Sequence, residues 1–306
     1  MGEPRATTIP VLEIGGTHVT AALVDSASWR TYPDSESRTS IRAQGTEDKI
    51  VEDVARAAQT LPVIVSTEWA VAIPGPFDYS GGIGLFEHVG KFDSLRGVDV
   101  RAALSGIIEP TPSYMHFLND ADAYGVGEFA VGAGRGRSRL VCITLGTGVG
   151  SAFLVDGEPL NSGPSVPSDG SVHLLEFKGK PLEETISRRA IRASFTTAAG
   201  SDAGAPDVHE IAALARRGDA VASRVLGDAF TSLGAALAEP LATFEADALV
   251  IGGSMSRSWD LVEPSVRAGL GGTVAPLAGL PILAAEHPED APVVGAAFWA
   301  AHHRRD

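Results

Sequence analysis

The sequence predicts an α/β protein made of two halves with a ligand-binding cleft between them. A strand, a turn of glycine and threonine, and a second strand occur near residue 15 and again near residue 147. Between these hairpins, a short apolar run leads through Asn119 and Asp120 into a helical segment. Strand and helix patterns alternate along most of the chain, which is typical of α/β folds.

The composition is that of a soluble globular protein. The 306 residues are 44% hydrophobic and 20% charged, with a formal net charge of -14. This length favours two domains, and the negative charge argues against a nucleic-acid-binding surface. The single cysteine, Cys142, excludes an intrachain disulfide and a cysteine-built zinc site, and its apolar surroundings indicate a core position. We find no signal peptide and no membrane-spanning apolar run, so we expect a cytoplasmic protein with no membrane partner.

The first hairpin is predicted from residues 9–14 and 18–25, joined by Gly15, Gly16 and Thr17. Glycines let backbone N–H groups approach an anion closely, and the threonine adds a hydroxyl group. The turn is therefore a candidate phosphate site, with a plain hairpin as an equal alternative.

The rest of the first half is predicted to alternate between strands and helices. A loop that contains Gly75 follows one of these strands, where small ligands usually bind in open α/β sheets. The predicted elements are a strand within residues 29–43, a helix at 46–61, a strand at 69–73, a helix at 100–107 and a strand at 115–118.

Asp120 is the candidate catalytic base. It follows the strand at 115–118 and precedes a helix at 121–129, which closes in the glycines of residues 132–134. Backbone amides and the positive end of the helix favour the ionised carboxylate there. The alternative is an ordinary helix cap, because Asn and Asp are preferred at that position.

The second hairpin is predicted from residues 140–145 and 149–155, joined by Gly146, Thr147 and Gly148. Two phosphate-holding turns that face each other across a cleft explain this recurrence better than two unrelated hairpins. The recurrence favours the interpretation of Asp120 as a functional residue.

The remainder of the second half combines a loop with further helices and strands. The loop at residues 161–179 carries Asp169 and His173, and a lone histidine is more often structural than functional. Gly252 and Gly253 end a strand, where the backbone could lie flat against a planar ring or simply turn into a helix. The predicted elements are a helix at 181–194, two helices within 205–239, strands at 248–251 and 281–285, and a helix at 292–302.

Five stretches of the chain resemble motifs of the ROK family of sugar kinases. That family belongs to the actin-like ATPase superfamily, whose members have two ribonuclease-H-like lobes. The stretches occur in the family's order: residues 12–17 (LEIGGT), 73–76 (IPGP), 118–121 (LNDA) with Gly127 and Glu128, 144–150 (TLGTGVG) and 250–253 (VIGG). The resemblance implies an N-terminal lobe of residues 1–118 with 288–306, and a C-terminal lobe of residues 119–287.

The resemblance also implies ATP and Mg²⁺ as cofactors and a hexose as substrate. Asp120 would take the proton from the 6-hydroxyl group of the hexose as that oxygen attacks the γ-phosphorus of ATP. The implied sugar-binding residues are Gly75, Asn119, Asp120, Asp169, His173 and Glu183. The implied nucleotide-binding residues are Gly15, Gly16, Thr17, His18, Gly146, Thr147, Gly148, Gly252 and Gly253.

The chain departs from the family pattern in three places. Glu13 replaces the aspartate that helps to place Mg²⁺, so we expect an indirect metal contact there. Gly170 replaces the glutamate of the Glu-x-x-His sugar motif, with Asp169 beside it. The cysteine-rich zinc loop is missing, so we expect no structural zinc.

These departures leave the substrate and the activity open. Glucose is the default substrate, and a glucose-type amino sugar such as kanosamine is the rival, because Asp169 could pair with an ammonium group. A catalytically weakened sensor of sugar or nucleotide is the alternative to a kinase. We expect no DNA-binding domain, because the first glycine turn comes about fifteen residues into the chain. We also expect a homodimer.

Overall fold

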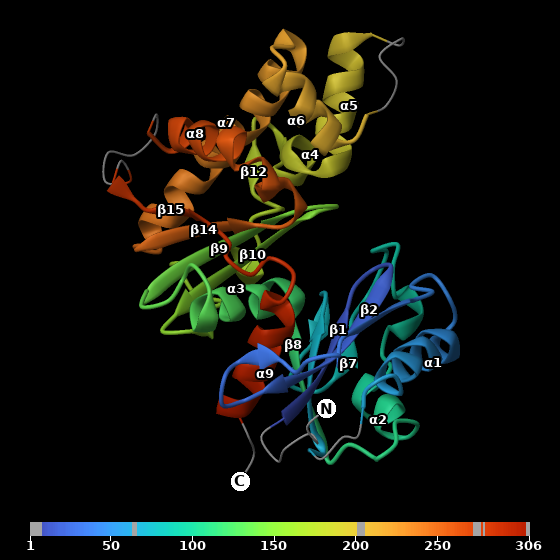
Figure 1. The fold of residues 1–306 in the computed structure, drawn as a ribbon. Helices are drawn as coiled ribbons and strands as arrows, with labels where there is room; N and C mark the ends of the chain where they lie inside the picture. Colours follow the sequence, from blue (N-terminus) through green and yellow to red (C-terminus); the bar gives the residue numbers. More distant parts are fainter. Residues whose placement is uncertain (1–7, 63–65, 201–205, 272–276, 278, 304–306) are drawn as a thin grey trace. The chain divides into compact units, whose positions relative to one another are not determined.

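The computed structural model describes residues 8–62, 66–200, 206–271, 277 and 279–303. Contacts divide the chain into two units (Figure 1), of which the first comprises Met1–Val131 and Glu289–Asp306 and the second Gly132–Pro288. Helix α3 (Asp120–Val131) belongs to the first unit because it packs along α9 (Ala291–His302). The lobe boundary predicted after residue 118 assigned this helix to the second half instead.

The first unit contains a mixed sheet in the order β3-β2-β1-β5-β8, with β4 also paired to β2. Strand β1 runs antiparallel to β2, whereas β5 is parallel to β1 and β8 is parallel to β5. The carboxyl ends of β1, β5 and β8 therefore lie at one edge, where ligands usually bind in such sheets. The bounds are β1 Thr8–Ile14, β2 His18–Asp25, β3 Arg30–Thr31, β4 Ser37–Ser40, β5 Glu68–Ile73 and β8 Tyr114–Asn119.

Helices cover both faces of this sheet (Figure 1). Helices α1 (Glu47–Ala58) and α2 (Val100–Ser105) pack over a core that includes Leu12 and Trp69. Helices α3 and α9 pack together, and α9 contacts β1 and β5. The strand predicted within residues 29–43 is two short strands, because the polar stretch at 33–36 separates β3 from β4. The loop between β5 and α2 contains β6 (Phe77–Asp78), β7 (Ile83–Gly84) and the 3-10 helix η1 (Asp93–Leu95).

The second unit repeats this strand arrangement in the order β11-β10-β9-β14-β15. Strand β9 is antiparallel to β10 and parallel to β14, which is parallel to β15. The predicted position of Cys142 in the core is confirmed, because it is buried in β9. The bounds are β9 Arg139–Leu145, β10 Val149–Val155, β11 Glu158–Pro159, β14 Ala248–Gly252 and β15 Ile282–Ala284, with a separate pair β12 Glu176–Phe177 and β13 Lys180–Pro181.

The helices of the second unit share one core with β9 and β14. The continuous helix predicted at 181–194 is wrong, because the backbone is extended at Ser187, whose hydroxyl group caps the following helix by accepting from Ala190 N. A helix after β14, not predicted, contains Pro264. The two helices predicted within 205–239 are confirmed, with residue 205 outside the described residues. The bounds are α4 Glu183–Ile186, α5 Arg188–Ala199, α6 Val208–Arg216, α7 Ala220–Thr243 and α8 Trp259–Gly271, with 3-10 helices η2 Ser168–Gly170 and η4 Ser254–Ser258.

No helix in the described part of the chain has the length and apolar character that crossing a bilayer requires.

Each unit joins two helices through a reciprocal pair of glycines. In the first unit, a Cβ on Gly127 would lie 2.0 Å from the carbonyl oxygen of Ala291, and a Cβ on Gly295 would lie 1.9 Å from that of Ala123. In the second unit, α7 and α8 meet in the same way, at Gly234 and Gly269, where the corresponding distances are 2.1 and 2.2 Å. These separations leave no room for a side chain, so the glycines allow backbone-to-backbone helix packing.

Two glycines of α7 test this packing, because they have opposite surroundings. Gly234→Ala places a methyl group against the carbonyl of Val266, so we expect the free energy of unfolding to fall by roughly 1–3 kcal/mol. The matched control is Gly227→Ala, whose Cβ would have no neighbour within 4 Å, and there the higher helix propensity of alanine should raise stability by about 0.5–1 kcal/mol. Urea unfolding followed by circular dichroism measures both. Equal effects of the two changes would contradict the packing described.

Candidate active site

At the junction of β8 and α3, the residue that caps the helix and the candidate catalytic base are two different residues. Asn119 Oδ1 accepts hydrogen bonds from the amides of Ala121 (2.9 Å) and Asp122 (3.3 Å), so Asn119 caps the helix. The Asp120 carboxylate is half-buried and accepts from the Ala121 amide at 2.9 Å through Oδ1. The capping role that the sequence left open for the Asn-Asp pair therefore falls to Asn119.

Tyr79 fixes the orientation of the Asn119 amide. Asn119 Nδ2 donates to the Tyr79 hydroxyl oxygen at 2.9 Å, so both ends of the amide group are held. Burial raises the pKa of the Tyr79 phenol above its ordinary value and keeps it neutral. Gly75 lies against the same hydroxyl group, because a Cβ there would lie 3.2 Å from it. Sequence reasoning singled out Gly75 but missed Tyr79, for which the available signal was an aromatic residue in a loop directly after a strand.

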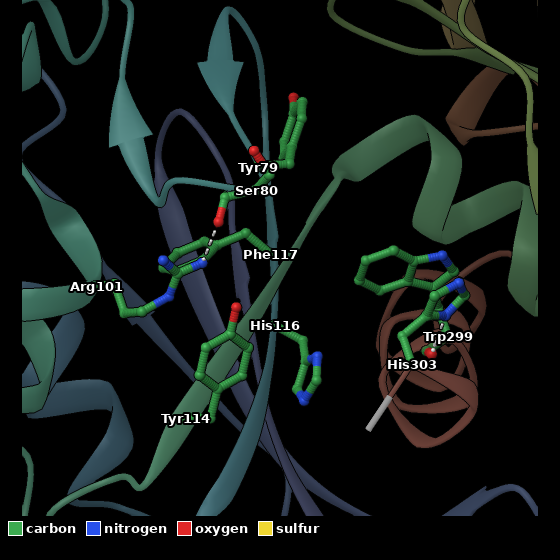
Figure 2. A pocket seen from close by; sticks show the side chains of 8 residues that line it. All are labelled: Tyr79, Ser80, Arg101, Tyr114, His116, Phe117, Trp299 and His303. Atoms are coloured by element: carbon green, nitrogen blue, oxygen red, sulfur yellow. Dashed lines mark hydrogen bonds between the residues drawn. The ribbon is translucent and has the colours of Figure 1, made fainter. Parts of the chain in front are cut away.

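A hollow of about 190 Å³ lies beside the loop that carries Tyr79 (Figure 2). Arg101 braces this loop, because its guanidinium donates to the carbonyl oxygens of Ser80 (3.0 Å) and Gly81 (2.6 Å). The same group lies over the ring of Tyr114, 4.9 Å from its centroid. The lining residues are Tyr79, Ser80, Arg101, Tyr114, His116, Phe117, Trp299 and His303. The arginine is thus committed to holding the loop.

The surroundings of Asp120 shift the pKa of its carboxyl group in opposite directions. Burial raises the pKa of its carboxyl group, while the Lys91 charge and the Ala121 amide lower it. Glu13 lies on β1 opposite Thr20, and its pKa is raised by burial and by the Asp120 charge, although the Thr20 hydroxyl group lowers it. The negative charge of Asp120 thus acts on Glu13. Carboxylate oxygens are suitable Mg²⁺ ligands, and a divalent cation would relieve this repulsion, whereas a raised pKa weakens metal binding. The metal role of Glu13 stays a prediction.

The first glycine turn leaves backbone donors available. Gly15 N–H donates to the carbonyl oxygen of His18 at 2.8 Å and closes the hairpin. Among the residues that the structure describes, the amides of Gly16 and Thr17 donate no hydrogen bond, and both residues are exposed. Thr17 Oγ1 lies 3.0 Å from Nδ1 of His18, the first residue of β2. Adjacent free amides of this kind can bind an anion.

The second unit brings together the other two glycine segments. Gly146 N–H donates to the carbonyl oxygen of Gly148 at 3.0 Å and leaves Thr147 exposed at the tip. A Cβ on Gly253 would lie 2.4 Å from the carbonyl oxygen of Leu145, and Gly253 has a φ of 81°. Gly252 pairs with Thr144 in the sheet. The close approach of the β9 backbone is therefore a sufficient reason for glycine at 253, independent of any nucleotide.

Two predicted sugar-binding residues meet beside the second turn. The Glu183 amide donates to the carbonyl oxygen of His173 at 3.1 Å. A Cβ on Gly148 would lie 2.6 Å from Glu183 Oε1, so this carboxylate contacts the turn that was predicted to bind phosphate. His173 and Glu183 are both half-buried. The structure therefore brings a predicted sugar segment and a predicted phosphate segment together within one unit.

The departure at Gly170 has a local structural reason. Gly170 has a φ of 63°, and a Cβ there would lie 2.6 Å from Asn161 Oδ1. Its carbonyl oxygen accepts from Ser151 Oγ at 2.6 Å. The neighbouring Asp169 is exposed, with a φ of 54°. A glutamate at 170 would require a strained backbone and displacement of Asn161.

The predicted site residues thus fall into two groups. No cluster of three or more His, Cys, Asp or Glu side chains that could hold a metal occurs in the described ranges. The first unit holds Glu13, Gly15, Gly16, Thr17, His18, Gly75, Asn119 and Asp120, and the second holds Gly146, Thr147, Gly148, Asp169, His173, Glu183, Gly252 and Gly253.

The fold and the glycine turns define a mixed α/β protein of the actin-like ATPase type. The sequence matches the ROK family over residues 10–303, and the chain belongs to that family. It is 28% identical over 334 residues to a glucokinase of Streptomyces coelicolor, covering 94% of this chain and 96% of the relative. It is 26% identical over 311 residues to a glucokinase of Thermotoga maritima, covering 94% and 95%.

A solved structure supports the same fold. The chain is similar to a ROK family glucokinase from Streptomyces griseus in complex with glucose and AMPPNP, with a TM-score of 0.78 and 23% identity. The similarity covers 96% of this chain and 99% of the other.

The assignment of the cap to Asn119 predicts opposite effects of two neighbouring substitutions on stability. Asn119→Ala removes the cap, so the free energy of unfolding should fall by roughly 0.5–2 kcal/mol. Asp120→Asn should leave it unchanged or raise it at pH 7, because a carboxyl group whose pKa is raised by folding destabilises the folded state when ionised. Denaturant unfolding at pH 7 measures both. A loss of more than 1 kcal/mol from Asp120→Asn would show that Asp120 shares the cap.

Proposed function

We propose that this protein is an ATP-dependent hexose kinase with Asp120 as general base. The observation that carries the proposal is the half-buried Asp120 carboxylate at the strand edge, relieved of capping by Asn119. The first glycine turn, with its free amides, belongs to the same unit. The glucokinase names of the Streptomyces coelicolor and Thermotoga maritima relatives support a hexose as the substrate.

The proposed reaction transfers the γ-phosphoryl group of ATP to the 6-hydroxyl group of the sugar. The sugar oxygen forms a bond to the γ-phosphorus as its proton passes to Asp120. The bond between the γ-phosphorus and the bridging oxygen breaks, and ADP leaves with that electron pair. A base works best when its pKa is near the working pH, and burial moves the pKa of Asp120 in that direction.

Most of the remaining catalysis would be alignment and charge stabilisation, as phosphoryl transfer requires. In the first unit, the free amides of Gly16 and Thr17 would bind phosphate oxygens. In the second unit, the turn at Gly146–Gly148 is the proposed phosphate-binding segment. Glu13 would hold Mg²⁺ through water. When bound, the metal ion neutralises charge on the phosphate oxygens.

Sugar-binding residues are proposed for each unit by itself. In the first unit, the fixed amide of Asn119 and the backbone at Gly75 would face the sugar beside Asp120. His173 and Glu183 of the second unit would bind ring hydroxyl groups, supported by the backbone hydrogen bond that joins them. A buried sugar hydroxyl group that loses such a partner costs about 1–3 kcal/mol of binding free energy.

Glucose and a glucose-type amino sugar such as kanosamine are the two proposed substrates. The exposed carboxylate of Asp169 supports the amino sugar, because it could pair with an ammonium group. The glucokinase names of the relatives support glucose. The ratio of kcat/KM for the two sugars distinguishes them.

A catalytically weakened sensor of sugar or nucleotide is the second candidate. The raised pKa of Glu13 favours it, because a protonated carboxyl group binds a metal ion poorly. A cytoplasmic location and a homodimeric state stay predictions.

Replacement of Asp120 tests the proposed base. Asp120→Asn should lower kcat by roughly 10²–10⁴-fold and leave the Kd for the sugar within about threefold, because an amide cannot accept the proton but keeps a similar shape. A coupled assay for ADP over a panel of hexoses measures kcat, and calorimetry measures Kd. Asp48→Asn, an exposed change on α1, is the control and should have wild-type activity. A variant with half of the wild-type turnover would contradict the assignment, and no ATP consumption by the wild type with any hexose would favour the sensor.

A further inference from the structure

Lys91 lies beside the first glycine turn, and its charge acts on Asp120. It is half-buried in the loop between β7 and η1. Its Cδ atom would lie 3.4 Å from a Cβ built on Gly16, so the side chain passes along the turn. Its charge is also the largest influence that lowers the pKa of Asp120. The Lys91 side chain thus contacts the turn proposed to bind phosphate, and its charge also acts electrostatically on the proposed base.

The loop that carries Lys91 is held by its own residues. The backbone is left-handed at His88, Gly90 and Phe92, with φ values of 57°, 78° and 61°. The Asp93 carboxylate accepts from the amides of Val89 (3.1 Å) and Gly90 (3.3 Å). Phe92 follows Lys91 in the sequence, and its buried side chain anchors the loop. The position of Lys91 is therefore set by the fold.

A neighbouring segment supports this loop from outside. The Phe92 amide donates to the carbonyl oxygen of Ala43 at 2.6 Å, and Gln44 Nε2 donates to that of Gly90 at 3.1 Å. Ser94 Oγ donates to the carbonyl oxygen of Gly45 at 2.8 Å. Residues 43–45 thus fix the loop on both sides of Lys91.

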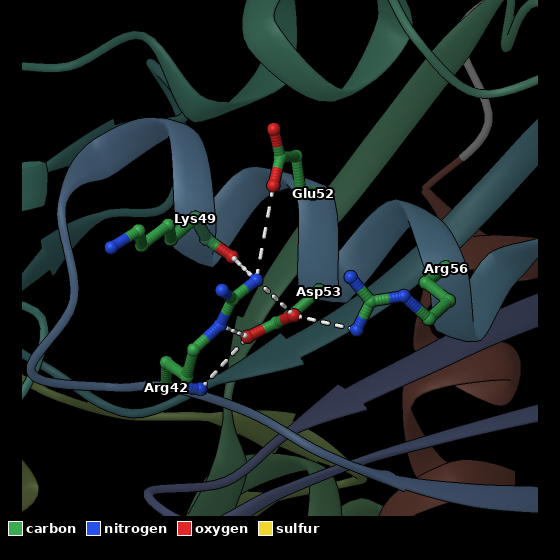
Figure 3. Close-up of polar contacts among 5 residues, drawn as sticks. All are labelled: Arg42, Lys49, Glu52, Asp53 and Arg56. Atoms are coloured by element: carbon green, nitrogen blue, oxygen red, sulfur yellow. Dashed lines mark hydrogen bonds and ion pairs between the residues drawn. The ribbon is translucent and has the colours of Figure 1, made fainter.

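The segment before residue 43 is tied to α1 by a buried carboxylate (Figure 3). Asp53 accepts from the Arg42 amide (2.9 Å), from Arg42 Nε (2.8 Å) and from Arg42 Nη2 (2.7 Å). Arg56 Nη1 donates to Asp53 Oδ1 at 2.7 Å. These partners hold the pKa of Asp53 well below its usual range, so the Asp53 carboxylate stays ionised at neutral pH and keeps its hydrogen bonds to Arg42 and Arg56. A continuous set of contacts thus connects α1 to the loop of Lys91.

The Lys91 ammonium group is not committed to an ion pair. Within the described ranges, no carboxylate oxygen lies within the 4.0 Å that defines a salt bridge to it. A half-buried cation without a salt bridge, beside free backbone amides, is suited to bind an anion that arrives with the substrate.

We propose that Lys91 is a catalytic residue whose ammonium group binds the transferring phosphoryl group. The proposal rests on the proposed kinase function. As the bond from the sugar oxygen to the γ-phosphorus forms and the bond to the bridging oxygen breaks, negative charge spreads over three phosphoryl oxygens. Lys91 donates hydrogen bonds to these oxygens and keeps its own proton, while the proton of the sugar goes to Asp120. A preorganised cation at such a place stabilises the transition state more than the ground state.

The test compares Lys91→Met and Lys91→Gln with Lys91→Arg in the full-length protein. In both neutral variants kcat should fall by roughly 10²-fold, with KM for the sugar within about twofold. Lys91→Arg keeps the charge and should recover part of the loss. Lys49→Met, which removes an exposed lysine from α1, is the matched control and should leave kcat unchanged. Thermal melting confirms that each variant is folded.

The pH dependence of kcat/KM distinguishes a catalytic role of Lys91 from a role in which Lys91 only shifts the pKa of Asp120. The groups that face Asp120 are Lys91, Glu13, Tyr79 and the Ala121 amide. Removal of Lys91 should raise the pKa of Asp120, so the acidic limb should move to higher pH. A catalytic Lys91 also lowers the plateau above that limb. A plateau within threefold of wild type in either folded neutral variant would overturn the proposal, whereas an inactive wild-type protein would refute the kinase function itself.

Discussion

The division of roles between Asn119 and Asp120 is the constraint on which the candidate active site depends. A strand that runs directly into a helix presents unpaired amides at the junction, and these amides need an acceptor. Asn119 supplies it through Oδ1, and Tyr79 holds the other end of the same amide group. Asp120 is thereby placed at the helix N-terminus without being the residue that caps it. Burial and Lys91 then act on its pKa in opposite directions.

The same physical solutions occur in both units. Each has an antiparallel hairpin closed by a glycine N–H group, at Gly15 and at Gly146, followed in the sheet by parallel strands. Each also joins two helices by reciprocal glycines that let the backbones touch. In both units the glycine turn lies at the edge where the parallel strands end, which is where such sheets bind ligands.

Much of this arrangement could be predicted from local sequence patterns. Alternating apolar residues identified the central strands, and the Gly/Thr turns and the Asn-Asp junction identified the candidate site. Local patterns did not reveal the break at Ser187, because an apolar helical spacing continues across it and only the backbone conformation shows the extended residue. Tyr79 and Lys91 were missed for another reason. Each acts on a residue distant in the sequence, and no local spacing encodes such contacts.

The glycines show most clearly that a sequence motif alone does not establish the role of a residue. Gly253 matches a nucleotide-binding pattern, yet the Leu145 backbone alone requires a glycine at this position. Gly170 breaks the family's sugar motif, and its φ and the nearby Asn161 amide account for the absence of a side chain. The surrounding backbone can therefore require a glycine as readily as a bound ligand can, and only the three-dimensional structure distinguishes these two causes.

The central claim is that Asp120 receives the proton of the attacking sugar hydroxyl group. A crystal structure with glucose and a non-hydrolysable ATP analogue tests it most directly. The account predicts the 6-hydroxyl oxygen within about 2.6–3.2 Å of an Asp120 carboxylate oxygen, the distance that proton transfer requires. A different hydroxyl group at that carboxylate, or a sugar bound out of reach of Asp120, would contradict the account.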